Sequence, residues 1–447
     1  MKRKIFAFFL LTLVLFSAIA PMNLHAKEYD GEDDLTSKMV TVFNIEKGVV
    51  VYGKDEHEAF PVGSAAKIMT ALLALEYYDG YLDTIVTVPA AALRGLEGGA
   101  VLQLKADEQI AVIDLIHATL IAGMNDAANT LAYTIAGSPA EFVKLMNSKA
   151  QELGAFNTVY QNATGLPTAA VSYTTAYDTA KIAAYAYENA RFMEICSKRA
   201  YVVEATNIHE AVTIYTKNSF LTPQSDYYYK YAEGMSTGYS DTDGAQLVCA
   251  ASNGNYPYIC VAFGSMKNSE KTIPGYSEVK SLLSWASTNF GERKVLDKSQ
   301  IICELPVRAG KDVAHVLVVP YESIYSFLDK DADLSKITLS KQLYYESLDA
   351  PVHKGDCVGM LTILLDGVPV GTTDLIAKTT IRQSASGKLL LFLEKIVTST
   401  VFIVFALISL PIICFFAYCK YVQFKRKRLM QKRKRAIAEK DSEQQKN

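Results

Sequence analysis

Ser64 and Lys67 are the residues whose types and spacing best suit chemistry. They lie three residues apart in the run PVGSAAK (residues 61–67), at the start of a predicted helix. Residues at this spacing share one helix face, so we expect the Lys67 amine beside the Ser64 hydroxyl. A helix N-terminus favours developing negative charge, and partial burial of a lysine there lowers its pKa. The pair predicts a serine nucleophile with a lysine base. Taken alone, the same pattern also fits a helix-capping serine followed by a surface lysine.

The run SAAKIMTALLALE (residues 64–76) resembles the nucleophile helix of the D-alanyl-D-alanine carboxypeptidases. These low-molecular-mass penicillin-binding proteins are serine peptidases that also carry an S-x-N triplet and a K-T-G strand. The resemblance extends from Ser37 to Phe290. Its further landmarks follow in order: NDAA at residues 125–128, GLP at 165–167, YTTAYD at 173–178 and GMSTGYS at 234–240.

Two positions depart from the family pattern. Gly123 stands where the second motif should begin with serine, and Ser236 stands where the third motif should have lysine. The missing hydroxyl belongs to the proton-transfer network, where a positioned group contributes ~10² to 10⁴-fold in rate. The missing lysine is a cation near the substrate carboxylate, and a hydrogen bond to a charged group is worth ~1.5 to 3 kcal/mol. Lys217 and Lys230 are both close to the third motif in the chain, and either could supply that charge.

The resemblance implies a role for each motif residue. Lys67 takes the proton of Ser64, which attacks the penultimate D-alanine carbonyl of the substrate. The backbone N–H groups of Ser64 and Tyr239 hold the oxyanion. Asn125 holds Lys67 or the substrate amide, and the same residue also suits a helix N-cap. Thr237 is expected at the substrate carboxylate, although an ordinary edge strand would look the same. The expected substrate-binding residues are Thr237, Gly238 and Tyr239.

By the same resemblance, the substrates are peptidoglycan stem peptides that end in D-Ala-D-Ala, and β-lactams are trapped covalently at Ser64. No cofactor or metal is implied. Three hypotheses follow. The chain is an active D-Ala-D-Ala carboxypeptidase, an impaired homologue that binds cell-wall peptide or a partner protein without turnover, or a serine hydrolase with an altered substrate.

Hydrophobic periodicity predicts the elements that position these motifs. A hairpin is expected from Lys38–Phe43 and Val49–Tyr52. Strands at both ends with helices between them indicate an α+β domain over residues 37–290. By resemblance, this is a penicillin-binding/β-lactamase-like domain, an antiparallel sheet with helices. Helices are expected around residues 68–75, 110–120, 142–146 and 273–290, and later strands at 246–251 and 256–263.

A second domain is predicted over residues 294–388, where short runs of alternating polarity replace the helical pattern. No cluster of catalytic residue types occurs there, so we expect an all-β pedestal between the first domain and a membrane. Its strands are expected at residues 301–305, 313–319, 337–340, 358–365 and 368–376.

Both ends of the chain indicate export and membrane attachment. Residues 1–26 have a basic start, an uncharged run and then Leu24, His25 and the small residue Ala26, which is the order of a signal peptide with cleavage expected after Ala26. An uncleaved anchor is the alternative, but its apolar run is short. Residues 396–419 contain no Asp, Glu, Lys or Arg and predict a transmembrane helix. The basic segment at 420–447 is expected to stay cytoplasmic, with the catalytic domain outside.

Charge and the remaining motifs are less informative. The net charge of -2 combines a basic tail with an acidic exported part, which argues against a nucleic-acid partner. GMSTG (residues 234–238) matches the G-x-S-x-G nucleophile elbow, but no helix is expected after it.

The six histidines show no triad or zinc spacing, and we expect His117 to be a core residue. Cys249 and Cys260 flank a predicted hairpin turn, so they are expected to face each other across it. They form either a cross-strand disulfide or two buried thiols.

Overall fold

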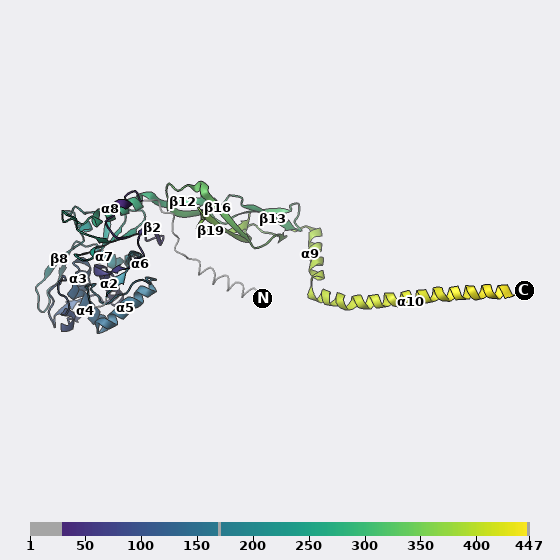
Figure 1. Cartoon of the computed structure of the whole chain (residues 1–447), viewed down its shortest axis with the longest axis horizontal. Coiled ribbons are helices and arrows are strands. Elements are labelled where there is room, and N and C mark those ends of the chain that lie inside the picture. Colours follow the sequence, from purple (N-terminus) through teal and green to yellow (C-terminus); the bar gives the residue numbers. More distant parts are fainter. Residues whose placement is uncertain (1–28, 169–170, 445–447) are drawn as a thin grey trace. The chain divides into compact units, whose positions relative to one another are not determined.

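The computed structural model describes residues 29–168 and 171–444 (Figure 1). The predicted signal peptide at residues 1–26 lies outside them. The chain divides into two compact units. The first extends to Arg293 and includes Tyr325–Lys336, and the second comprises Lys294–Ile324 and the residues from Ile337 onward. The sequence gives no sign that residues 325–336 return to the first unit.

A five-stranded antiparallel sheet forms the centre of the first unit, in the order β2-β1-β11-β10-β9. Because β1 pairs with β11, the two ends of the domain meet in one sheet. The predicted hairpin and late strands are confirmed, and β9 lies at the sheet edge. The strands are β1 (Met39–Asn44), β2 (Val49–Lys54), β9 (Ala232–Ser240), β10 (Gly244–Ala251) and β11 (Tyr258–Ser265).

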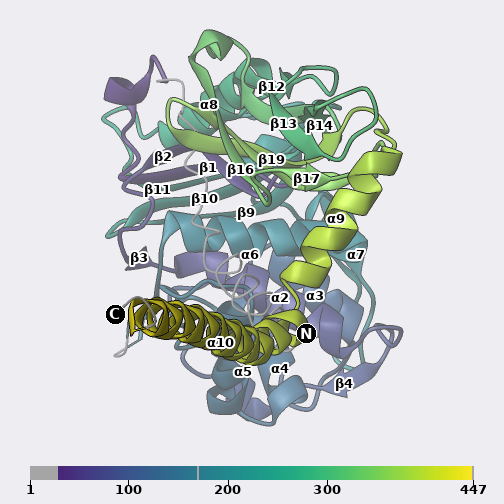
Figure 2. The same ribbon diagram turned by 90° about the vertical axis from the view of Figure 1, so that its right-hand side faces the viewer.

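Helices cover both faces of this sheet. In Figure 2, α8 (Gly275–Asn289) lies above the sheet, and α2 and α6 lie below it. Along β10, Leu247 and Cys249 face the core under α8, whereas Val248 and Ala250 face the other helices. This period of two is expected of a strand buried on both faces, and the α+β fold is confirmed. The helices on the second face are α2 (Ala66–Tyr77), α3 (Val112–Ile121), α4 (Asn125–Ala136), α5 (Pro139–Glu152), α6 (Ala176–Glu188) and α7 (Ala190–Cys196).

Short strand pairs and single turns connect these elements. The pairs are β3 (Phe60–Pro61) with β6 (Tyr173–Thr174), β4 (Ile85–Thr87) with β5 (Gln109–Ala111), β7 (Ala200–Val203) with β8 (Val212–Tyr215), and β12 (Phe290–Leu296) with β15 (Ile324–Asp329). The 3₁₀ turns of this unit are η1 (Glu32–Asp34), η2 (Gly63–Ala65), η3 (Ala90–Leu93), η4 (Ser219–Leu221) and η5 (Leu334–Lys336).

The structure decides the predicted roles of the two hairpin cysteines and of His117. Cys249 and Cys260 lie directly opposite each other in β10 and β11, and both are buried free thiols. His117 is buried, its ring stacks on Tyr201 with 3.6 Å between centroids, and its Nδ1 lies 2.8 Å from the Ile113 carbonyl oxygen. Burial lowers the pKa of His117 to about 4. His117 is therefore the core residue that the sequence predicts.

The second unit is built on a six-stranded sheet in the order β16-β18-β19-β14-β13-β17. Along β18, buried and partly exposed residues alternate, as expected of a strand with one covered face. The predicted all-β domain is confirmed, with every expected strand present. The strands are β13 (Cys303–Arg308), β14 (His315–Pro320), β16 (Ile337–Leu343), β17 (Leu348–Asp349), β18 (Cys357–Leu365) and β19 (Val368–Ala377).

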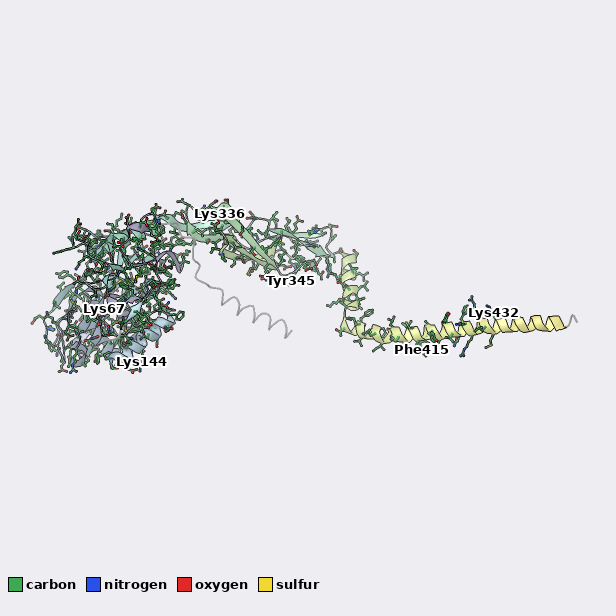
Figure 3. The ribbon with its side chains drawn as sticks, viewed as in Figure 1. Lys67, Lys144, Lys336, Tyr345, Phe415 and Lys432 are labelled. Carbon is green, nitrogen blue, oxygen red and sulfur yellow. The ribbon has the colours of Figure 1, made fainter. Side chains whose placement is uncertain are left out.

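Two helices follow the β domain (Figure 3): α9 (Ala385–Val397) and α10 (Thr400–Gln444). Within α10, Phe402–Lys432 is long and apolar enough to cross a membrane, so it is a candidate anchor. The predicted span begins earlier, at Ile396, but the helix breaks after Val397. The hydroxyls of Thr398 and Ser399 donate to the carbonyls of the preceding turn, which is how such side chains compete with helix continuation.

Candidate active site

The turn that carries Ser64 follows strand β3 directly. Pairing of β3 with β6 places Phe60 opposite Thr174, so the YTTAYD landmark supports the approach to the turn. Gly63 has φ 51, in the left-handed region that favours glycine, and η2 then runs into α2 at Ala66. Ser64 therefore stands at the entry to a helix, where the sequence places it.

Lys67 lies in the first turn of α2 and is 7% exposed. Its Nζ donates a hydrogen bond of 2.6 Å to the carbonyl oxygen of Thr164. Burial, with a smaller contribution from the positive charge of Lys217, lowers the pKa of Lys67 to about 7. A substantial fraction of the amine is therefore neutral near pH 7, which a general base requires.

A tight loop holds the Thr164 carbonyl in place. Asn162 Oδ1 accepts hydrogen bonds from the backbone N–H groups of Thr164 at 3.1 Å and Gly165 at 2.6 Å. Gly165 has φ 76, and a Cβ there would lie 1.7 Å from the carbonyl oxygen of Gly63. Any side chain at this position would displace the nucleophile turn, which explains why the GLP landmark begins with glycine.

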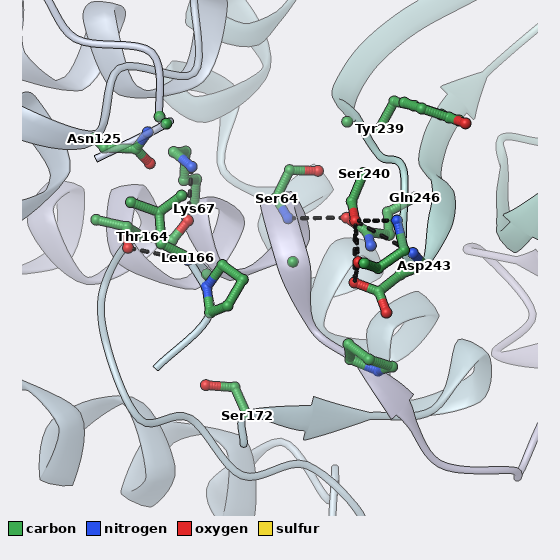
Figure 4. A pocket seen from close by; sticks show the side chains of 18 of the residues that line it. Ser64, Lys67, Asn125, Thr164, Leu166, Ser172, Tyr239, Ser240, Asp243 and Gln246 are labelled. Atoms are coloured by element: carbon green, nitrogen blue, oxygen red, sulfur yellow. Dashed lines mark hydrogen bonds between the residues drawn. The ribbon is translucent and has the colours of Figure 1, made fainter. Parts of the chain in front are cut away.

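The Ser64 hydroxyl is buried and has no hydrogen-bond partner within the described residues. Figure 4 shows its oxygen turned away from Lys67, toward the side where Tyr239 lies. A Cβ built at Gly238 would lie 2.3 Å from Ser64 Oγ, so strand β9 approaches the nucleophile as closely as glycine allows. Rotation of Ser64 about its Cα–Cβ bond is the movement that turns the hydroxyl toward the Lys67 amine.

Gln246 is a site residue that we did not predict from the sequence. It lies in β10 opposite Gly238 and is buried. Its Oε1 accepts a hydrogen bond of 3.3 Å from the Ser64 backbone N–H, which is one of the two expected oxyanion donors. A substrate carbonyl would have to displace this amide. The signal that could have identified Gln246 is a polar side chain within an otherwise apolar strand.

Asn125 is the first residue of α4, and Met124 occupies the cap position without a side-chain cap. The interpretation of Asn125 as an N-cap is therefore wrong. Its Nδ2 donates to the Ala100 carbonyl at 3.0 Å, whereas its Oδ1 is buried with no partner within the described part of the chain. That oxygen is free to accept a hydrogen bond from Lys67 or from a substrate amide. At Gly123, with φ 66, a Cβ would meet nothing within 4 Å.

The third motif lies in β9. The Ser236 hydroxyl donates to the Ser64 carbonyl at 3.3 Å, and the Thr237 hydroxyl donates to the Lys217 carbonyl at 3.4 Å. Ser236 stands in the middle of a strand that pairs with β10, which excludes a nucleophile elbow at this serine. Because β9 is an edge strand, alternate backbone N–H groups along it point away from β10.

A cavity of about 470 Å³ lies between these elements (Figure 4). The structure brings a buried amine, a hydroxyl and the edge of β9 together around one space, which is an arrangement suited to acyl transfer. The predicted residues that line it are Ser64, Lys67, Asn125, Gly238 and Tyr239. Those outside its lining are Gly123, Ser236 and Thr237.

Comparisons with known proteins agree with this arrangement. Residues 26–267 match the family model of D-alanyl-D-alanine carboxypeptidase, and residues 290–383 match the C-terminal domain of penicillin-binding protein 5. D-alanyl-D-alanine carboxypeptidase DacF of Bacillus subtilis is 26% identical over 379 residues, which cover 84% of this chain and 94% of the relative. DacC of Escherichia coli is 25% identical over 385 residues, covering 81% and 89%.

Solved structures show the same fold. Penicillin binding protein 5 from Haemophilus influenzae superimposes with a TM-score of 0.57 at 23% identity, over 78% of this chain and 98% of that one. Fold and site together define a serine peptidase of the penicillin-binding class. The chain belongs to the D-alanyl-D-alanine carboxypeptidase family and is a serine-type D-Ala-D-Ala carboxypeptidase.

Proposed function

We propose that this chain removes the terminal D-alanine from peptidoglycan stem peptides through an acyl-enzyme on Ser64, outside the cytoplasmic membrane. The observation that supports this most is the buried Lys67 amine, whose pKa is lowered to about 7 and which shares one cavity with Ser64. A lysine with a pKa near the working pH is suited to remove a serine proton.

Acylation begins when the Ser64 hydroxyl turns to Lys67 and transfers its proton to the Nζ. The oxygen then attacks the carbonyl carbon of the penultimate D-alanine. The backbone N–H groups of Ser64 and Tyr239 hold the resulting oxyanion once the Gln246 amide has moved aside. The carbon–nitrogen bond breaks, the leaving amine takes the proton from the Lys67 ammonium, and D-alanine departs, which leaves Lys67 neutral again.

Deacylation reverses the same steps with water as the nucleophile. Lys67 removes a proton from the water, the water oxygen attacks the ester carbon, and the Ser64 oxygen leaves with the proton that Lys67 returns to it. Asn125 Oδ1, which has no partner in the described structure, holds the Lys67 ammonium or the substrate amide during the cycle. A β-lactam enters by the same attack and remains as a stable ester on Ser64.

The location follows from the two ends of the chain. A signal peptide at residues 1–26 exports the chain, and the apolar part of α10 then spans the membrane. The basic segment beyond it, residues 420–447, stays in the cytoplasm by the positive-inside rule. The domains at residues 37–290 and 294–388 are therefore extracytoplasmic, with the second as a pedestal.

The test uses the full-length chain in detergent. Fluorescent penicillin should label it, the Ser64→Ala variant should remain unlabelled, and D-alanine should be released from a stem pentapeptide. Intact, folded chain that takes no label and releases no D-alanine contradicts the proposal.

Three observations favour a second function, binding of cell-wall peptide without turnover. The Ser64 hydroxyl is turned away from Lys67, whose amine is bonded to the Thr164 carbonyl, and Gly123 provides no hydroxyl to relay a proton. In that case, the Gly123→Ser, Ser236→Lys double variant should raise D-alanine release above that of the unmodified chain. Turnover of the unmodified chain at ordinary enzyme rates of ~1 s⁻¹ or more excludes this alternative.

A further inference from the structure

Because Ser236 stands where the family pattern has lysine, the third motif lacks a cation. We consider three lysines near that strand as its replacement. Lys230 is fully exposed and lies over the Tyr231 ring, with its Nζ 4.5 Å from the ring centroid. Lys267 lies over the Tyr239 ring at 4.0 Å and within 4.0 Å of Asp241. Each of these two has a partner of its own. The third lysine is Lys217.

The main chain of Lys217 is held between the two motifs that have lost a residue. Its N–H donates to the carbonyl of Ile121 at 3.1 Å, two residues before Gly123. Its carbonyl accepts the hydrogen bond of the Thr237 hydroxyl in β9 at 3.4 Å. The main chain of Lys217 is thus bonded to Ile121, just before the second motif, on one side and to the third motif on the other.

The ammonium of Lys217 has no hydrogen bond or ion pair to any residue that the structure describes. Its charge nevertheless reaches the catalytic pair, since it contributes to lowering the pKa of Lys67. Burial lowers the pKa of Lys217 as well, although the residue keeps an exposed surface. An exposed lysine without a partner among the described residues is available to an anion that enters the site.

Lys217 lines a second cavity, of about 660 Å³, that adjoins the first along one segment of chain. Residues 98–100 line the Ser64 cavity, and residues 101–104 line the second one. Asn125 faces the first cavity, whereas Met124 faces the second. Position 123 lies at this boundary and is open, because a Cβ there would touch nothing within 4 Å. Because residue 123 is glycine, it adds no side chain between the residues that line the two cavities.

We propose that Lys217 is the cation that binds the terminal carboxylate of the substrate in place of the missing lysine of β9, with Thr237 as a positioning residue that holds the Lys217 main chain. This inference rests on the proposed function, because it assigns the group that recognises the same D-Ala-D-Ala end. The two departures from the family pattern are then linked. The charge has moved from position 236 to position 217, and the loss of a side chain at 123 leaves it room.

The test measures binding, so that it does not depend on turnover. In a Ser64→Ala background, the affinity for diacetyl-L-Lys-D-Ala-D-Ala is compared with that for its C-terminal amide. Lys217→Gln should weaken binding of the acid by ~10 to 100-fold and leave the amide unchanged, because a hydrogen bond between charged groups is lost. Lys230→Gln is the matched control and should change neither. Adding Ser236→Lys to Lys217→Gln should restore binding of the acid.

Three results would overturn the assignment. The first is equal affinity for acid and amide in the Ser64→Ala chain, including no measurable binding of either. The second is an equal loss for both ligands in Lys217→Gln, which indicates a structural role. The third is an acid-specific loss in Lys267→Gln instead. A chain that binds the acid through Lys217 but releases no D-alanine refutes the proposed turnover and leaves this inference intact.

Discussion

The two sides of the active-site cavity differ in how much of the family pattern they keep. On the side of α2, Ser64 and Lys67 are both present, and the loop around Gly165 fits tightly against their turn. On the facing side, Gly123 and Ser236 replace the expected serine and lysine. The nucleophile side depends on close packing around one buried amine. The facing side depends on a cation, which we assign to Lys217 in place of residue 236.

The largest expected effect tests the nucleophile side. Ser64→Ala should reduce D-alanine release by at least ~10⁴-fold, because removal of a nucleophile leaves only binding and oxyanion stabilisation. The control is Ser172→Ala, a second serine of the same cavity, which should lose less than about tenfold. Comparable losses in the two variants would show that Ser64 is not the nucleophile. Release is measured with a D-amino-acid oxidase assay, and folding is checked by circular dichroism.

The base on the same side predicts a pH dependence. Only neutral Lys67 accepts the Ser64 proton, and its pKa is about 7, so the rate of penicillin labelling should rise with pH through about 7 and then level off. Lys67→Met should label ~10² to 10⁴-fold more slowly at pH 8. Stopped-flow labelling from pH 5.5 to 8.5 measures both. A rate that stays constant across this range would contradict the assignment of Lys67 as base.

Burial of the Lys67 amine should also lower the free energy of unfolding. The folded chain holds the pKa of Lys67 below its unfolded value, so folding is penalised fully below about pH 7 and not at all above about 10.5. Lys67→Met should therefore raise the free energy of unfolding by ~2 to 4 kcal/mol at pH 6, and by less as the pH rises toward 10. Urea unfolding at several pH values measures the difference. A gain that does not shrink with rising pH would argue against a buried charge as its cause.

A smaller effect concerns the oxyanion donor, where the two sides meet. Gln246→Met keeps the side-chain volume but removes the oxygen that accepts the hydrogen bond of the Ser64 N–H. Acylation should become ~2 to 5-fold faster, while the free energy of unfolding falls by about 1 kcal/mol for the lost hydrogen bond. Penicillin labelling and thermal unfolding report the two quantities. Slower acylation would mean that Gln246 helps to position the turn.

The smallest effect tests the facing side alone. In Gly123→Ser the new side chain has free space, but the backbone must keep φ 66. This strain should lower the free energy of unfolding by about 1 kcal/mol. Gly80→Ser, at an exposed glycine with φ 76 and equally free space, is the matched control for this backbone cost. Gly123→Ser should differ from it in labelling rate and resemble it in stability. A much larger loss of stability at 123 would mean that the site is less open than its geometry indicates.

Much of the fold was predictable because its signals are local. The hairpin of β1 and β2, helices α2 and α8, and the strands of the second unit all follow from periodicity within short windows. The return of β15 to the first unit was not predictable, since pairing between distant segments leaves no local trace. The end of α9 was not predicted either. It depends on the hydroxyls of Thr398 and Ser399, which lie in the run 396–419 that predicts one continuous helix.

The sequence by itself determined the nucleophile, its base and the family, because three-residue spacing on a helix is a local property and the motifs occur in a fixed order. The tertiary structure decided what surrounds that pair. Burial sets the pKa of Lys67, and the pairing of β9 with β10 brings Gln246 under Ser64. Hydrogen bonds to Ile121, just before the second motif, and to Thr237 of the third motif hold the main chain of Lys217. Burial and contacts between distant segments exist only once the chain has folded, so residue spacing could not reveal them.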